Sequence, residues 1–155
     1  MPKNKIKIEV PYHHQKKDYY CGPASMKMVL AYFKRHFTQD QLAHSLETSP
    51  IYGTAHASMA DMAKEEGLYV YTKNDSNLSE ISDFLEKGLP IIINFIDPSS
   101  EEGHYAVVSG ITYSEIILAD PWNGRDFRLG FCDFLDRWHS KRSNHWLMVI
   151  SQDML

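Results

Sequence analysis

The chain of 155 residues contains only two cysteines, Cys21 and Cys132, too few for a disulfide scaffold. One disulfide between them is possible in principle, but it would prevent either thiol from reacting. The formal net charge of -4 gives no electrostatic reason to expect a nucleic-acid partner. The longest apolar stretch, 90–96, is far too short to span a bilayer, so no membrane insertion is expected.

Other familiar signals are absent as well. No glycine-rich phosphate loop, paired-cysteine motif or cysteine–histidine cluster at ligand spacing occurs, so neither a metal nor an organic cofactor is expected. Residues 1–10 alternate charge with isoleucine and lack the apolar core of a signal peptide, which favours a cytoplasmic location. No repeat or low-complexity linker divides the sequence, so residues 1–155 are expected to form a single domain.

Hydrophobic periodicity predicts helices mainly in the first half of the chain and strands mainly in the second. Helices are expected over 22–33, 38–46, 58–67, 77–88 and 131–138, the third of them with Ser58 as its N-cap. Strands are expected over 6–10, 68–72, 90–95, 104–112, 115–119 and 146–150, with a tight hairpin at 113–114. This order indicates an α+β domain in which N-terminal helices pack against a C-terminal antiparallel sheet.

Cys21 is the most informative residue because it stands where the first long helix is expected to begin. Pro23 suits the first turn of that helix, and the unpaired backbone N–H groups there create a positive field that favours a thiolate. Gly22 leaves room for another backbone to approach the sulfur. The alternative is a buried structural thiol, the usual state of a free cysteine. Cys132 lies in an amphipathic stretch and is assigned to the core.

His104 and Asp120 are candidates for the same site. His104 follows a glycine at the start of an apolar strand, and Asp120 closes another strand just before Pro121. Cysteine, histidine and a carboxylate are the components of a thiol hydrolase. The alternative for Asp120 is a turn initiator, since Asp-Pro is strong turn chemistry. The remaining histidines are taken as surface or capping residues: His13, His14, His36, His44, His56, His139 and His145.

Three segments resemble the C39 and C39-like cysteine peptidases, which belong to the papain-like superfamily. They are the block from Val10 to Ser25 with its Gln15 and Cys21-Gly22-Pro23-Ala24-Ser25, then Gly103-His104-Tyr105-Ala106-Val107-Val108, then Ala119-Asp120-Pro121. The resemblance covers nearly the whole chain and implies a papain-like fold. The best-known members are the double-glycine leader peptidases of peptide exporters, but a double-glycine specificity is only an analogy for this chain.

The resemblance also implies roles for individual residues. Cys21 matches the nucleophile, His104 the general base and acid, Asp120 the residue that orients the imidazole, and Gln15 the oxyanion-hole donor. The expected reaction is hydrolysis of a peptide or related amide bond in a peptide or protein substrate, through a thioester on Cys21. Two alternatives stay open: acyl transfer to an amine instead of water, and a binding module that holds a peptide without cleaving it. The presence of all four matching residues argues against the second.

Overall fold

The computed structural model describes residues 5–155, so residues 1–4 of the expected single domain lie outside the described residues. A seven-stranded antiparallel sheet lies at the centre, in the order β2-β7-β3-β4-β5-β6, with β1 pairing with β4. Its strands are β1 (Ile6–Lys7), β2 (Tyr69–Lys73), β3 (Ile91–Ile96), β4 (Gly103–Ile111), β5 (Glu115–Asp120), β6 (Gly124–Gly130) and β7 (Leu147–Ser151). The helices are α1 (Cys21–Tyr32), α2 (Gln39–Ser45), α3 (His56–Glu65), α4 (Leu78–Glu86) and α5 (Phe131–Arg137).

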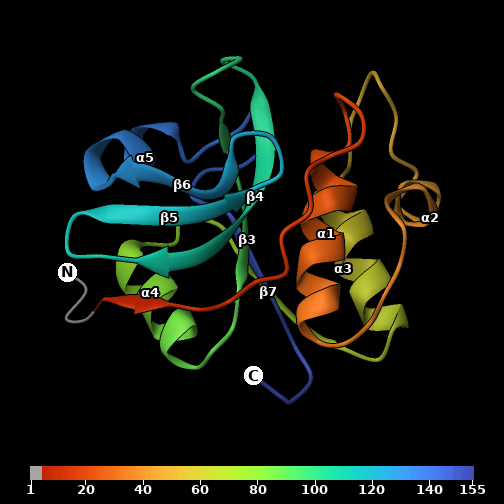
Figure 1. Ribbon diagram of the computed structural model, residues 1–155, viewed down its shortest axis with the longest axis horizontal. Helices are drawn as coiled ribbons and strands as arrows, with labels where there is room; N and C mark the ends of the chain where they lie inside the picture. The colour runs from red at the N-terminus through yellow and green to blue at the C-terminus, as the bar shows by residue number, and fades with distance from the viewer. Residues whose placement is uncertain (1–4) are drawn as a thin grey trace.

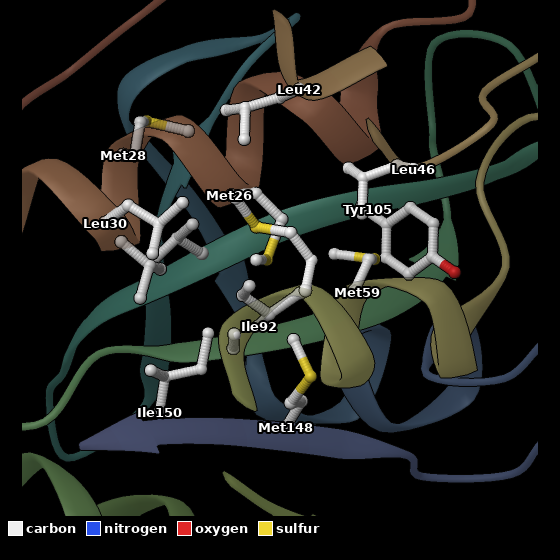
Figure 2. Packing of buried hydrophobic residues seen from close by; sticks show 14 of the residues in the cluster. Met26, Met28, Leu30, Leu42, Leu46, Met59, Ile92, Tyr105, Met148 and Ile150 are labelled. Atoms are coloured by element: carbon white, nitrogen blue, oxygen red, sulfur yellow. The ribbon is translucent and has the colours of Figure 1, made fainter. Parts of the chain in front are cut away.

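Helices cover both faces of this sheet (Figure 1). On one face, methionines and leucines of α1, α2 and α3 pack against Ile92, Tyr105 and Met148 of the sheet (Figure 2). On the other face, α4 and α5 pack against a second cluster of sheet residues. Because β3 and β7 are covered on both sides, their sequences are almost continuously apolar rather than alternating. The α+β class expected from the sequence is confirmed.

The helices expected over 38–46 and 77–88 and the hairpin expected at 113–114 are also confirmed. Thr38 and Gln41 form a reciprocal capping box at the start of α2, and Asn77 caps α4 by accepting from the Glu80 N–H at 2.9 Å. The hairpin between β4 and β5 closes through the Thr112 N–H, which donates to the Glu115 carbonyl at 2.8 Å. These elements are specified by neighbouring residues in the sequence, which is why local patterns predict them well.

Four predictions were wrong in detail. The first strand covers only Ile6–Lys7, and strand β6 was not predicted because its charged residues hide the alternation. Helix α3 begins at His56 with Ala55 as its N-cap, since contacts of the His56 ring fix the chain before Ser58. Cys132 is exposed rather than in the core, because α5 turns Phe134 and Trp138 toward the sheet and Cys132 away from it.

Candidate active site

His104 and Asp120 meet at one end of the sheet. Strands β4 and β5 are antiparallel neighbours, so the beginning of β4 lies beside the end of β5. The His104 imidazole donates from Nε2 to Asp120 Oδ1 at 2.7 Å, and the two residues are 7% and 0% exposed. Asp120 Oδ1 also accepts from the backbone N–H groups of Trp122 and Asn123, at 2.9 and 3.1 Å. The carboxylate is therefore fixed, and the imidazole is left with Nδ1 for another partner.

Cys21 is the half-buried first residue of α1, and its thiol is close enough to that imidazole to act on the pKa of His104. Burial alone would lower the pKa of His104, but hydrogen bonds and charge from Asp120 and Cys21 outweigh it and raise that pKa to about 10. The N-cap of α1, Tyr20, makes no side-chain capping bond, so the first-turn N–H groups remain available beside the sulfur. The structure thus brings together the predicted cysteine, histidine and aspartate.

Gln15 lies in the segment that leads into α1, and it is 5% exposed rather than a surface loop residue. Its Nε2 donates to the carbonyls of Lys17 and Asp18 at 2.8 and 3.0 Å, so both amide hydrogens are occupied. Its backbone N–H donates to the Pro121 carbonyl at 2.9 Å, one residue after Asp120. Gln15 is therefore held by its side chain to the segment before α1 and by its backbone to the segment that carries Asp120.

The start of α2 anchors the segment around Gln15. Gln39, itself 6% exposed, accepts from the Lys16 N–H at 2.9 Å and donates to the His14 carbonyl at 2.8 Å. Asp40 binds Lys16 Nζ at 2.7 Å and accepts from the Tyr20 hydroxyl at 2.9 Å. Two consecutive residues of α2 thus hold the chain on both sides of Gln15 and just before Cys21.

This anchoring predicts a stability effect. Gln39→Ala is expected to lower the free energy of unfolding by about 2 kcal/mol, because two backbone groups in a partly buried segment lose their partners. For a chain of this size the Tm should fall by about 4–8 °C, which urea and thermal unfolding would measure. Gln41→Ala is the matched control: it removes an exposed capping bond worth about 1 kcal/mol. Equal losses in the two variants would contradict the anchoring role.

The loop before α3 packs directly against the start of α1. A methyl group added at Gly22 would meet Thr54 Oγ1 at 2.4 Å, so the glycine provides room for this side chain. The expectation that Gly22 leaves this space to an approaching backbone was therefore wrong. Thr54 is held in turn by the Thr48 hydroxyl at 2.8 Å and by the Tyr105 hydroxyl, which donates to its carbonyl at 2.8 Å. The loop tip, Ile51 and Tyr52, is exposed.

The neighbourhood of Tyr105 contains a histidine that the sequence did not single out. His56 binds the Tyr105 hydroxyl through Nδ1 and Ser143 Oγ through Nε2, at 3.2 Å for the latter. Its ring stacks on Trp146 with centroids 3.9 Å apart. Burial, and then the charge of Arg142, lower the pKa of His56 to about 4, so it is neutral at pH 7. His56 is thus a half-buried structural residue rather than a surface one.

Two further properties of residues 5–155 bear on the site. No helix among them combines the length and the apolar character needed to cross a membrane. No group of three or more histidine, cysteine, aspartate or glutamate side chains within these residues is arranged to hold a metal ion.

Comparison with known proteins identifies the family. A model of the family described as "Peptidase_C39 like family" matches residues 7–144. The chain belongs to this family. Among curated proteins, no sequence matches it. The resemblance noted from the three sequence segments is therefore confirmed.

Solved structures of C39 peptidases share the fold of this family member. A putative C39-like peptidase from Bacillus anthracis has a TM-score of 0.81 at 15% identity, covering 99% of this chain and 100% of its own. The peptidase domain of Streptococcus ComA, a bifunctional ABC transporter of a quorum-sensing pathway, has a TM-score of 0.77 at 19% identity, with 94% and 100% covered. A double-glycine motif protease from an AMS/PCAT transporter, solved with a leader peptide, has a TM-score of 0.76 at 20% identity, with 95% and 96% covered.

Proposed function

We propose that the protein is a cysteine peptidase whose catalytic triad is Cys21, His104 and Asp120. The observation that carries the proposal is the buried His104–Asp120 pair at 2.7 Å, with the Cys21 thiol beside the same imidazole at the start of a helix. Membership of a C39-like peptidase family supports the same conclusion. A buried imidazole fixed by a carboxylate has little use in a protein that only binds peptides, but it is needed to move protons.

The reaction follows from the positions of these groups. The Cys21 proton passes to His104, and the sulfur attacks the carbonyl carbon of the scissile bond to give a tetrahedral oxyanion. When that intermediate collapses, the C–N bond breaks and the imidazolium gives its proton to the departing amine. A thioester remains on Cys21. His104 then takes a proton from water, the hydroxide attacks the thioester, and the imidazolium returns the proton to the sulfur as the acid leaves.

The oxyanion is assigned to the backbone N–H of Cys21 and to the Gln15 amide. Each such donor is typically worth about 3 kcal/mol of barrier. Because Gln15 Nε2 already donates to Lys17 and Asp18 at 2.8 and 3.0 Å, it must share or exchange one of these bonds to reach the oxyanion. The role of Gln15 therefore requires a small local adjustment when substrate binds.

The proposed substrate is a peptide or protein segment. One structural neighbour, a double-glycine motif protease, was solved with a leader peptide bound. The first substrates to test are accordingly peptides with a Gly-Gly pair before the scissile bond, alongside a peptide library without that pair. Product masses measured with and without excess amine will show whether water or an amine accepts the acyl group.

The first experiment is the rate at which iodoacetamide alkylates Cys21 as a function of pH. Because Cys132 is exposed and also reacts, the measurement uses Cys132→Ser as the parent. An ordinary thiol ionises at about pH 8.5. Rapid labelling at roughly pH 6 is therefore expected only if His104 holds the proton of the Cys21 thiol. His104→Ala should lose this rapid labelling while Cys21 remains present and accessible.

The labelling profiles distinguish a thiol activated by His104 from an ordinary thiol. Rapid labelling that depends on His104 supports the proposed pair and justifies the substrate search. Slow labelling with an ordinary profile in both proteins would show that the thiol is not activated, and the proposed mechanism would then be wrong. His56→Ala, which removes a different half-buried histidine, is the control for general effects of losing an imidazole.

A further inference from the structure

A second buried carboxylate lies behind the His104–Asp120 pair. Asp97 follows strand β3 and is 3% exposed. The Asn123 side-chain amide lies between the two carboxylates: its Nδ2 donates to Asp97 Oδ1 at 3.0 Å and to Asp120 Oδ2 at 3.1 Å. One amide group thus uses its two hydrogens to join Asp97 to Asp120.

Asp97 also organises the loop that carries the chain into His104. Its carboxylate accepts from the Ser99 N–H at 3.0 Å and from the Ser99 hydroxyl at 2.8 Å. Its backbone N–H donates to the Glu102 carbonyl at 2.9 Å, two residues before His104. The residue therefore fixes the β3–β4 loop with one set of bonds and the turn after β5 with another.

Among the described residues, few titratable side chains lie near the His104 imidazole. The titratable side chains nearest His104 are Cys21 of α1, Asp120 of β5 and Asp97, and the Phe95 ring of β3 lies 5.7 Å from the imidazole. The cation close to the β3–β4 loop, Arg137 of α5, pairs with Glu101 at 3.2 Å. Burial would raise the pKa of Asp97, but hydrogen bonds from Asn123 and Ser99 and the charge on His104 lower it, so Asp97 is ionised at pH 7.

We propose that Asp97 and Asn123 are positioning residues of the active site, with Asn123 fixing the Asp120 carboxylate and Asp97 adding a second negative charge that favours the His104 imidazolium. The catalytic meaning of this arrangement rests on the proposed function, but the effect on His104 does not require a substrate. Asp120 Oδ1 accepts three hydrogen bonds, from the His104 imidazole and from the backbone N–H groups of Trp122 and Asn123. Asn123 satisfies Oδ2 and so prevents the carboxylate from rotating.

The test is the titration of His104, followed by NMR of histidine-labelled protein and assigned with His104→Ala. In Asp97→Asn the amide oxygen can still accept from the Asn123 amide and the Ser99 N–H, and the new NH₂ group can donate to the Ser99 hydroxyl, which donates to Oδ2 in the parent. The substitution therefore removes the charge and keeps most of the loop contacts. The pKa of His104 is expected to fall by roughly half to one unit. Glu102→Gln, which removes an exposed charge from the same loop, should leave that pKa unchanged.

Asn123→Ala tests the orientation of Asp120 separately. Solvent exchange of the His104 Nε2 proton, which is protected by the 2.7 Å bond, should become roughly tenfold faster. Asn144→Ala is the matched control, because Asn144 makes the same kind of bond to Asp75 at 3.2 Å away from the site. A merely structural role would lower Tm in Asp97→Asn and Asn123→Ala without moving either readout.

The His104 pKa and the exchange rate of its Nε2 proton together decide the positioning role. A fall in the His104 pKa only in Asp97→Asn, with faster exchange in Asn123→Ala, supports the positioning role. An unchanged pKa and unchanged exchange would overturn it, even if Cys21 is reactive in the alkylation experiment. Conversely, an unreactive Cys21 together with a shifted His104 pKa would contradict the peptidase mechanism and leave the Asp97–Asn123–Asp120 connection established.

Discussion

Cys21→Ala is expected to abolish peptide hydrolysis while leaving the fold intact. The sulfur is the atom that forms the thioester, so without it only unassisted attack by water remains, and the rate should fall by at least about 10,000-fold. The side chain is half-buried at the edge of the core cluster, and alanine keeps its Cβ contacts, so truncation to alanine should change Tm little. Mass spectrometry of the peptide products and a thermal unfolding curve would measure the two effects.

The other cysteine provides the control for this experiment. Cys132 is an exposed thiol on α5, and Cys132→Ser should hydrolyse the same peptide at the parental rate. Hydrolysis that survives in Cys21→Ala would refute the proposed nucleophile. Loss of activity in both variants would point instead to a general sensitivity of the protein to cysteine replacement.

Asp120→Ala is expected to damage both activity and stability. His104 would lose its 2.7 Å partner, and the N–H groups of Trp122 and Asn123 would lose their acceptor. Breaking such a buried pair typically costs about 3–5 kcal/mol, and the rate should fall by about 1,000-fold or more. Asp120→Asn, which keeps an oxygen able to accept from the imidazole, should be less severe on both measures.

The stability cost of Asp120→Ala should also depend on pH. The pKa of His104 in the folded protein is raised to about 10, above the ordinary value of 6.5. The imidazolium therefore stabilises the folded protein fully below about pH 6.5. This stabilisation is lost as the pH rises through 10. Urea unfolding should therefore show the largest cost near pH 6 and a smaller one near pH 10. Asp126→Asn, an exposed carboxylate paired with Lys7, should cost less than about 1 kcal/mol. A cost that rises with pH would contradict this assignment.

The sequence predicted those parts of the site that have a local signature. Cys21 at a helix start and His104 at the start of an apolar strand are visible from neighbouring residues, and their meeting follows from packing α1 against the sheet. Strand β6 was missed because Arg125, Asp126 and Arg128 give it the composition of a loop, while its pairing with β5 makes it a strand. Edge strands commonly carry such charges.

The polar residues behind the site have no local signature. Asp97, Asn123 and His56 each look like an ordinary loop or helix-end residue, and the contacts that connect them to the site are distant in the sequence: Asn123 to Asp97 spans 26 residues, and His56 to Tyr105 spans 49. Cys132 was placed in the core from its apolar neighbours, although the helix turns it outward. Only the folded arrangement distinguishes a buried, bonded polar group from a solvated one.

The distance along the chain between Cys21 and its partners has a consequence during synthesis. Helix α1 leaves the ribosome roughly a hundred residues before Asp120, and at about 5–20 residues per second this interval lasts on the order of 5–20 s. Throughout that time the thiol has neither His104 nor the carboxylate that orients it. Under the proposed function, the growing chain therefore cannot cleave itself or its neighbours, because the proposed triad is complete only when β4 and β5 have joined the sheet.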